Sequence, residues 1–146
     1  MHFSVEMILD RISEMGNLYH QNHNFSTHIF SAKMLSDTSG PLEEGVLYVI
    51  PYDYLMNHSA LPACRNAMIL LPPGQDDLPV KIPEDWLLMS SPLPPVEILL
   101  AVQDAFVYYD RYYEQMIQSM ARGDGLQAIT DLVAGCTSCP ILLFDN

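Results

Sequence analysis

The sequence predicts an α/β fold: a small parallel or mixed sheet flanked by helices, followed by a long C-terminal helix and a short helix-strand unit. Three short apolar runs, residues 45–50, 67–71 and 86–89, are each closed by proline or serine, which is typical of buried strands. A helical spacing of apolar residues precedes these runs, and a long segment without proline or glycine follows them. This alternation of helices with buried strands indicates a layered α/β arrangement.

The N-terminal segment predicts an amphipathic helix over residues 5–15. Its apolar residues recur at the spacings of one helical face, Ser4 can cap the helix, and Gly16 can end it. The polar residues 19–24 then indicate a loop. Residues 25–35 fit a strand or a helix equally well.

A long helix is predicted over residues 96–122, because this segment lacks proline and glycine and because Pro94 and Pro95 suit a first helical turn. At 1.5 Å per residue it spans about 42 Å, more than a small sheet needs for its cover. Its apolar residues follow a heptad seam: Leu99, Val102, Phe106, Tyr109, Tyr113, Met116 and Met120. Either the first half packs on the chain's own sheet, or the second half pairs with a second copy. We predict a homodimer through this seam.

Beyond Gly125 the apolar spacing predicts another helix, and residues 140–144 (Pro-Ile-Leu-Leu-Phe) predict a strand. A lone apolar strand needs a partner, so we expect the natural chain to continue. The predicted organisation is a small α/β sensory domain over residues 1–93, a linker or dimerisation helix over 94–123, and the start of a second, truncated sensor-like domain over 124–146.

The charge of the chain limits the classes of partner that it is expected to bind. Eighteen acidic residues against six Lys and Arg give a formal net charge of −12. Nucleic-acid affinity comes largely from neutralising phosphates, so we expect no direct nucleic-acid contact by this segment, and an anionic membrane surface is disfavoured for the same reason. The sequence shows neither a transmembrane run nor a secretion signal, which predicts a cytoplasmic location.

Two clusters of metal-ligating or nucleophilic residues are weak candidates. Cys136-Thr-Ser-Cys139 follows a predicted helix and opens a strand, whereas a redox CxxC pair opens a helix that lowers the thiol pKa. A zinc site would need two more ligands, and Cys64 offers only one. The histidines at positions 20, 23 and 28 lie in a polar segment that reads as loop. We therefore expect no metal and no cofactor.

A catalytic site is not expected either. The adjacent acids at 43–44, 76–77 and 84–85 are loop neighbours, whereas a catalytic pair needs carboxylates that face each other in a cleft. No phosphate-binding loop or nucleophile elbow occurs. The sequence therefore predicts a protein that is not an enzyme.

A ligand, if the chain binds one, is predicted at the carboxyl ends of the strands over 45–50 and 67–71, where open α/β sheets form a crevice. Tyr52, Asp53 and Tyr54, in a short helix or turn just after the first of these strands, are the candidate contacts.

The C-terminal half carries a family resemblance. The stretches 102–106 (Val-Gln-Asp-Ala-Phe), 108–114, 120–127 and 140–145 together resemble the purine-catabolism-regulator (PucR-like) family of bacterial transcription regulators. The resemblance covers residues 99–146. It implies a non-catalytic N-terminal sensory and dimerisation region that responds to a small-molecule effector, with the helix-turn-helix that binds DNA located outside this chain.

Two other functions remain open from the sequence. Small acidic α/β dimers also act as chaperones or adaptors that hold a partner protein. A thiol or metal enzyme built on Cys136 and Cys139 is the third hypothesis.

Overall fold

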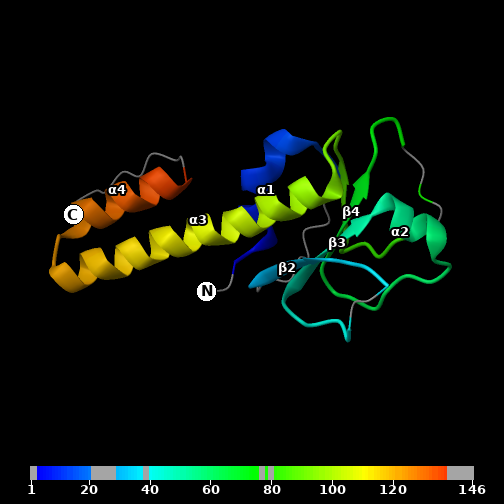
Figure 1. The fold of residues 1–146 in the computed structure, drawn as a ribbon. Coiled ribbons are helices and arrows are strands. Elements are labelled where there is room, and N and C mark those ends of the chain that lie inside the picture. The colour runs from blue at the N-terminus through cyan, green and yellow to red at the C-terminus, as the bar shows by residue number, and fades with distance from the viewer. Residues whose placement is uncertain (1–2, 21–28, 38–39, 76–77, 79–80, 138–146) are drawn as a thin grey trace. The chain divides into compact units, whose positions relative to one another are not determined.

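The computed structural model describes residues 3–20, 29–37, 40–75, 78 and 81–137, and it has the predicted α/β architecture (Figure 1). The helical elements are α1 (Val5–Ile12), the short 3-10 helix η1 (Ser13–Met15), α2 (Tyr52–Asn57), α3 (Pro95–Arg122) and α4 (Leu126–Thr137). The strands are β1 (Asn17–His20), β2 (Ser31–Met34), β3 (Val46–Pro51), β4 (Ala67–Leu71) and β5 (Leu87–Ser90). Within these residues, no helix is long and apolar enough to cross a membrane.

The strands form one mixed sheet in the order β1-β5-β4-β3-β2. Strands β2, β3, β4 and β5 follow one another in the sheet as they do in the chain, and each pairs with the next in parallel. Strand β1 pairs with β5 in the antiparallel direction. Parallel crossovers are right-handed, so three successive one-step crossovers in the same direction all run over the same face of the sheet. The described parts of the segments between these strands, α2 included, therefore cover one face.

The face under the crossovers has its own core. It consists of alternate residues of β3 and β4 together with residues of α2 and of the connecting segments: Leu35, Val46, Tyr48, Ile50, Leu55, Ala67, Ile69, Leu71 and Trp86. The Trp86 indole is fully buried, and its Nε1 donates to the Cys64 carbonyl oxygen at 3.2 Å. The only tryptophan thus ties the two connections that flank β4.

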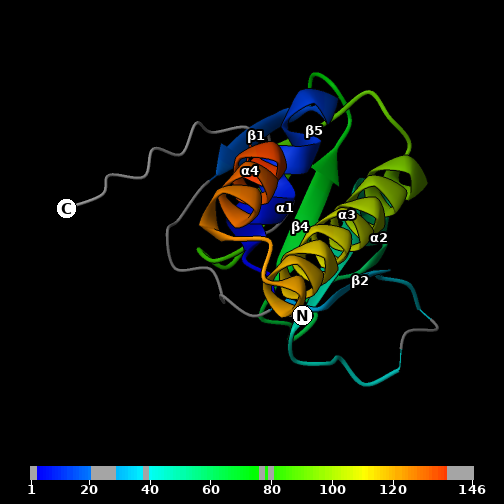
Figure 2. The same cartoon turned by 90° about the vertical axis from the view of Figure 1, so that its left-hand side faces the viewer.

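Helix α1 and the first half of α3 cover the opposite face (Figures 1 and 2). The helical spacing predicted for residues 5–15 is confirmed, with Ser4 accepting a hydrogen bond from the Met7 N–H at 3.3 Å. On α3, Ile98 and Val102 are fully buried, and the Phe106 ring lies 5.2 Å from that of Phe3. The Gln103 amide donates to the Ala32 carbonyl at 3.2 Å and so joins α3 to β2.

The loop predicted over residues 19–24 is wrong at its start, because residues 17–20 form β1. This strand pairs with β5, with Asn17 opposite Ser90. Its polar composition suits an edge strand with one side in water, and pairing with an apolar neighbour outweighs its low intrinsic strand propensity. Within the ambiguous segment 25–35, the part over 31–34 is strand β2. Residues 21–28 and the strand predicted over 140–144 lie outside the described residues.

The chain divides into two compact units, Met1–Phe106 and Val107–Asn146. The first holds the sheet, α1, α2 and the start of α3. The second holds the rest of α3 and α4, which folds back along it after a turn at Gly123 and Gly125, both with positive φ. Helix α3 is continuous through the division.

We expect Gly16→Ala to lower the free energy of unfolding by about 1–3 kcal/mol, as overpacking of a tight site does. A Cβ at Gly16 would lie 2.3 Å from the Ser90 carbonyl oxygen and 3.0 Å from Ser91 Cβ, so β1 and β5 would have to separate. Urea denaturation followed by circular dichroism measures the change. Gly40→Ala is the matched control, because a Cβ there meets no atom within 4 Å; equal effects of the two variants would contradict the close approach at Gly16.

Candidate functional site

A cavity lies at the carboxyl edge of the parallel strands. Strands β3 and β4 lead into connections on one face, whereas β5, the neighbour of β4, leads into α3 on the other. Neighbouring connections that leave toward opposite faces open a crevice beyond the strand ends, and open α/β sheets bind their ligands there. The topology therefore places the cavity where a ligand was predicted from the sequence.

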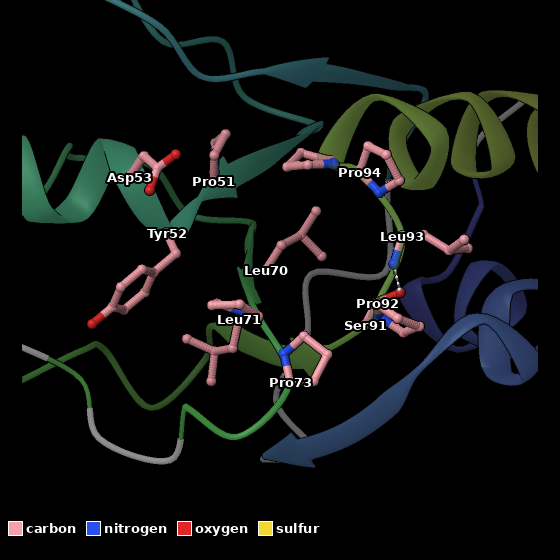
Figure 3. Close-up of a pocket in the computed structure, with 12 residues that line it drawn as sticks. Pro51, Tyr52, Asp53, Leu70, Leu71, Pro73, Ser91, Pro92, Leu93 and Pro94 are labelled. Atoms are coloured by element: carbon pink, nitrogen blue, oxygen red, sulfur yellow. Dashed lines mark hydrogen bonds between the residues drawn. The ribbon is translucent and has the colours of Figure 1, made fainter.

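This cavity has a volume of about 290 Å³, close to the lower end of the range of small-molecule sites. Figure 3 shows Tyr52 and Asp53 of α2 on one side and the segment 92–94 on the other, with Leu70 and Leu71 between them. Half of the lining residues are prolines: Pro51, Pro72, Pro73, Pro92, Pro94 and Pro95. The wall is thus mainly apolar, with Asp53 as its one ionisable carboxylate.

Ser91 fixes the segment that forms one wall of the cavity. Its backbone N–H donates to the Leu71 carbonyl at 3.1 Å, and its hydroxyl donates to the Met15 carbonyl at 2.6 Å. The same hydroxyl accepts the Leu93 N–H at 3.1 Å (Figure 3). The buried Ser91 therefore holds the end of β5, η1 and the start of the proline segment together. Ser91 is not among the site residues predicted from the sequence; the proline-rich segment directly after a buried strand is the signal that points to it.

Helix α3 begins at the wall of the cavity. Pro94 and Pro95 line it, and the Pro94 carbonyl accepts from the Glu97 N–H at 3.0 Å, which starts the helix. The acidic residues Asp53 and Glu97 lie in the first turns of α2 and α3, where a carboxylate complements the positive end of the helix dipole. Any change of the segment 91–95 therefore acts directly on the first turn of α3.

Tyr54 lies at a different place from Tyr52 and Asp53. Two residues correspond to about 200° around a helix, so Tyr54 leaves α2 on another side. It lines a second depression of about 310 Å³ with Asp37 and His58, and its ring stacks on the His58 ring with centroids 3.9 Å apart. The structure brings together only two of the three predicted ligand contacts.

His58 joins α2 to the segment that follows β2. Its Nδ1 lies 2.7 Å from the Tyr54 carbonyl oxygen, and its Nε2 lies 2.6 Å from Asp37 Oδ1. Both partners accept hydrogen bonds, so a ring nitrogen that carries a proton donates to the partner it faces. Both nitrogens of the His58 ring thus face partners within the chain.

The predicted dimer seam of α3 falls into a buried and an exposed part. Leu99 is half-buried, and Val102, Phe106 and Tyr109 are buried. Met116 is half-buried, whereas 43 % of Tyr113 and 62 % of Met120 are exposed. Only the end of the seam is thus open to a second molecule, and dimerisation stays a prediction for that part.

Within the second unit, α4 packs beside this seam rather than on it. The Tyr108 hydroxyl donates to the Gly135 carbonyl at 3.5 Å, and the Tyr112 ring lies against Gly135. The Ser119 hydroxyl donates to Asp124 Oδ2 at 3.1 Å near the turn between the helices. Because Tyr108, Tyr112 and Ser119 share another side of α3, Tyr113 and Met120 stay uncovered by α4.

The cysteines and other metal-ligating residues form no metal-binding cluster in the part of the chain that the structure describes. No group of three His, Cys, Asp or Glu side chains there can hold a metal ion. Cys139 lies outside that part, so the CxxC pair cannot be placed. Cys64 is half-buried, and burial raises the pKa of its thiol to about 11. A thiol in such a setting is neutral and weakly reactive at physiological pH.

Comparisons of the chain with protein-family models, curated proteins and solved structures gave no match. The resemblance to PucR-like regulators therefore stays a prediction.

Ser91→Ala is expected to lower the free energy of unfolding by about 1–3 kcal/mol, because the Leu93 N–H and the Met15 carbonyl both lose a partner at a buried position. Urea denaturation measures the loss, and amide exchange at Leu93 should accelerate. Ser13→Ala is the control: it removes one exposed bond, to the Asp10 carbonyl, and should change stability by less than about 0.5 kcal/mol. Equal losses of stability in the two variants would contradict the role of the Ser91 hydroxyl in holding this segment.

Alkylation of Cys64 at pH 8 should be about ten- to a hundredfold slower in the folded chain than in urea, because a raised pKa lowers the thiolate fraction. Iodoacetamide labelling of the Cys136→Ser/Cys139→Ser variant isolates this thiol. The folded-state rate should keep rising up to about pH 11. A rate that levels off near pH 8 would mean that the thiolate forms readily and would revive the thiol-enzyme hypothesis.

Proposed function

We propose that this chain is a non-catalytic sensory and dimerisation module of a bacterial transcription regulator that acts in the cytoplasm. In this proposal a small molecule binds the cavity at the carboxyl edge of the sheet, and α3 passes the state of that cavity to the rest of the protein. DNA is bound by a helix-turn-helix domain outside these residues, as the resemblance to PucR-like regulators implies.

The observation that carries the proposal is that the wall of the cavity is also the start of α3. Pro92, Leu93, Pro94 and Pro95 line the cavity, and Pro95 is the first residue of the 28-residue helix. A ligand that moves this segment must move or reorient the first turn of the helix. The hydrogen bonds of Ser91 hold the segment in one defined position. A helix that starts in one compact unit and ends in another is suited to transmit such a change.

The exposed end of the α3 seam supports dimerisation. Tyr113, Ile117 and Met120 are each more than 40 % exposed, and their spacing of four and three residues puts them on one side of the helix. The same side is buried at Val102 and Phe106. We propose that this exposed stripe packs against the same stripe of a second copy, which would space two DNA-binding domains for a two-fold-symmetric operator.

Charge placed in this stripe should convert the dimer into a monomer. We expect Tyr113→Glu/Met120→Glu to weaken self-association by at least about tenfold, because the pairing would bury two carboxylates per chain. Sedimentation equilibrium over a range of protein concentrations measures the association constant, and circular dichroism confirms the helices.

Gln115→Glu is the control, because it adds negative charge at an exposed position of α3 away from the stripe. It should leave the association constant nearly unchanged. A wild-type chain that stays monomeric at high concentration would contradict the dimer, and equal weakening by control and stripe variants would contradict the location of the interface.

A further inference from the structure

The wall of the edge cavity is poor in hydrogen-bond donors. Its six prolines have no N–H group. Three further donors are already used within the chain: the N–H groups of Ser91 and Leu93 and the Ser91 hydroxyl. The N–H groups of Leu70 and Leu71 belong to β4, which is paired with a strand on each side. Away from α2, a ligand therefore meets mainly carbonyl oxygens and carbon. The donors that remain are the Tyr52 hydroxyl and the first N–H groups of α2, which lie beside the Asp53 carboxylate.

The charge at the cavity has one sign. Asp53 is exposed and is the only charged side chain of the lining, which contains no Lys or Arg. Among the described residues, no basic side chain forms an ion pair with Asp53. The start of α3 offers little to an anion, because Pro95 lacks an N–H group and Glu97 already supplies a carboxylate to the first turn. An anionic ligand at the start of α2 would therefore meet the Asp53 carboxylate, which already lies in the first turn of that helix.

The rest of the lining favours an apolar body. Leu70, Leu71 and Leu93 lie beside the proline rings, and Tyr52, which precedes Asp53 in α2, adds an aromatic side chain to the lining. Burial of carbon against such a wall supplies affinity, at roughly 25 cal/mol per Å² removed from water. A single charge at one end of the cavity and carbon along the rest fit a molecule with one charged end.

We propose that the cavity binds a small organic cation, an amine carried on an apolar body, with its ammonium group at the Asp53 carboxylate. The apolar body lies against Leu70, Leu71 and the prolines. This inference rests on the proposed function, since it names the chemical class of effector for the same site.

Three probes with one phenylethyl body and different end groups test the charge: phenethylamine, phenethyl alcohol and hydrocinnamate. Each is titrated into the isotope-labelled chain at low salt, and NMR follows the amides of Tyr52, Asp53, Leu70, Leu71 and Leu93. We expect the amine to perturb these amides and to bind about three- to fivefold more tightly than the alcohol, as an exposed ion pair allows. The carboxylate should bind more weakly than the alcohol. Added salt should weaken only the amine.

Asp53→Asn should reduce binding of the amine to the level of the alcohol and leave binding of the alcohol unchanged. Asp104→Asn, the same change at an exposed position of α3 outside the cavity, should leave all three probes unaffected. Both variants change an exposed side chain, and their spectra report directly whether they are folded.

The outcomes separate the ligand class from the site. If the alcohol or the carboxylate binds at the cavity as well as the amine does, or if Asp53→Asn has no effect, the cationic class is overturned while the cavity stays an effector site. If no probe perturbs the amides of the cavity, the effector site itself is overturned.

Discussion

The parallel pairing of β4 between β3 and β5 is the constraint on which the sheet unit depends. All five residues of β4 are buried, and its backbone is paired on both sides. A strand of this kind needs apolar cover on both faces of the sheet. The crossovers and α2 supply one cover, and α1 with the start of α3 supplies the other. The cavity follows from the same arrangement, because covers on opposite faces must leave the carboxyl edge in different directions.

Helix α3 connects this constraint to function. Its apolar side is buried where it covers the sheet, at Val102 and Phe106, and continues without interruption into the exposed residues Tyr113 and Met120. Burial in the first part fixes which side of the start of the helix faces the sheet. In the proposed function, a bound molecule acts on the start of the helix, which the hydrogen bonds of Ser91 hold in place.

Elements with strong local signals could be predicted from the sequence. The strand over Ala67–Leu71 is reproduced without a shift, and α3 begins and ends within a residue of the expected positions. Such segments are apolar or periodic enough that local pattern and tertiary packing agree. Strand β1 could not be predicted, because Asn17–His20 has a polar sequence and becomes a strand only by pairing with β5, which lies about seventy residues away.

The sequence by itself determined the α/β class, the buried strands, the long helix and the expectation of a site at the carboxyl strand ends. Only the tertiary structure decided which residues form that site. Tyr52 and Asp53 line the cavity with the proline segment, whereas Tyr54 lines the second depression with His58. The physical reason is the separation along the chain over which each kind of interaction acts. Periodicity and strand propensity act between near neighbours in the chain, whereas the cavity is built by contacts such as that of Ser91 with Met15, 76 residues apart.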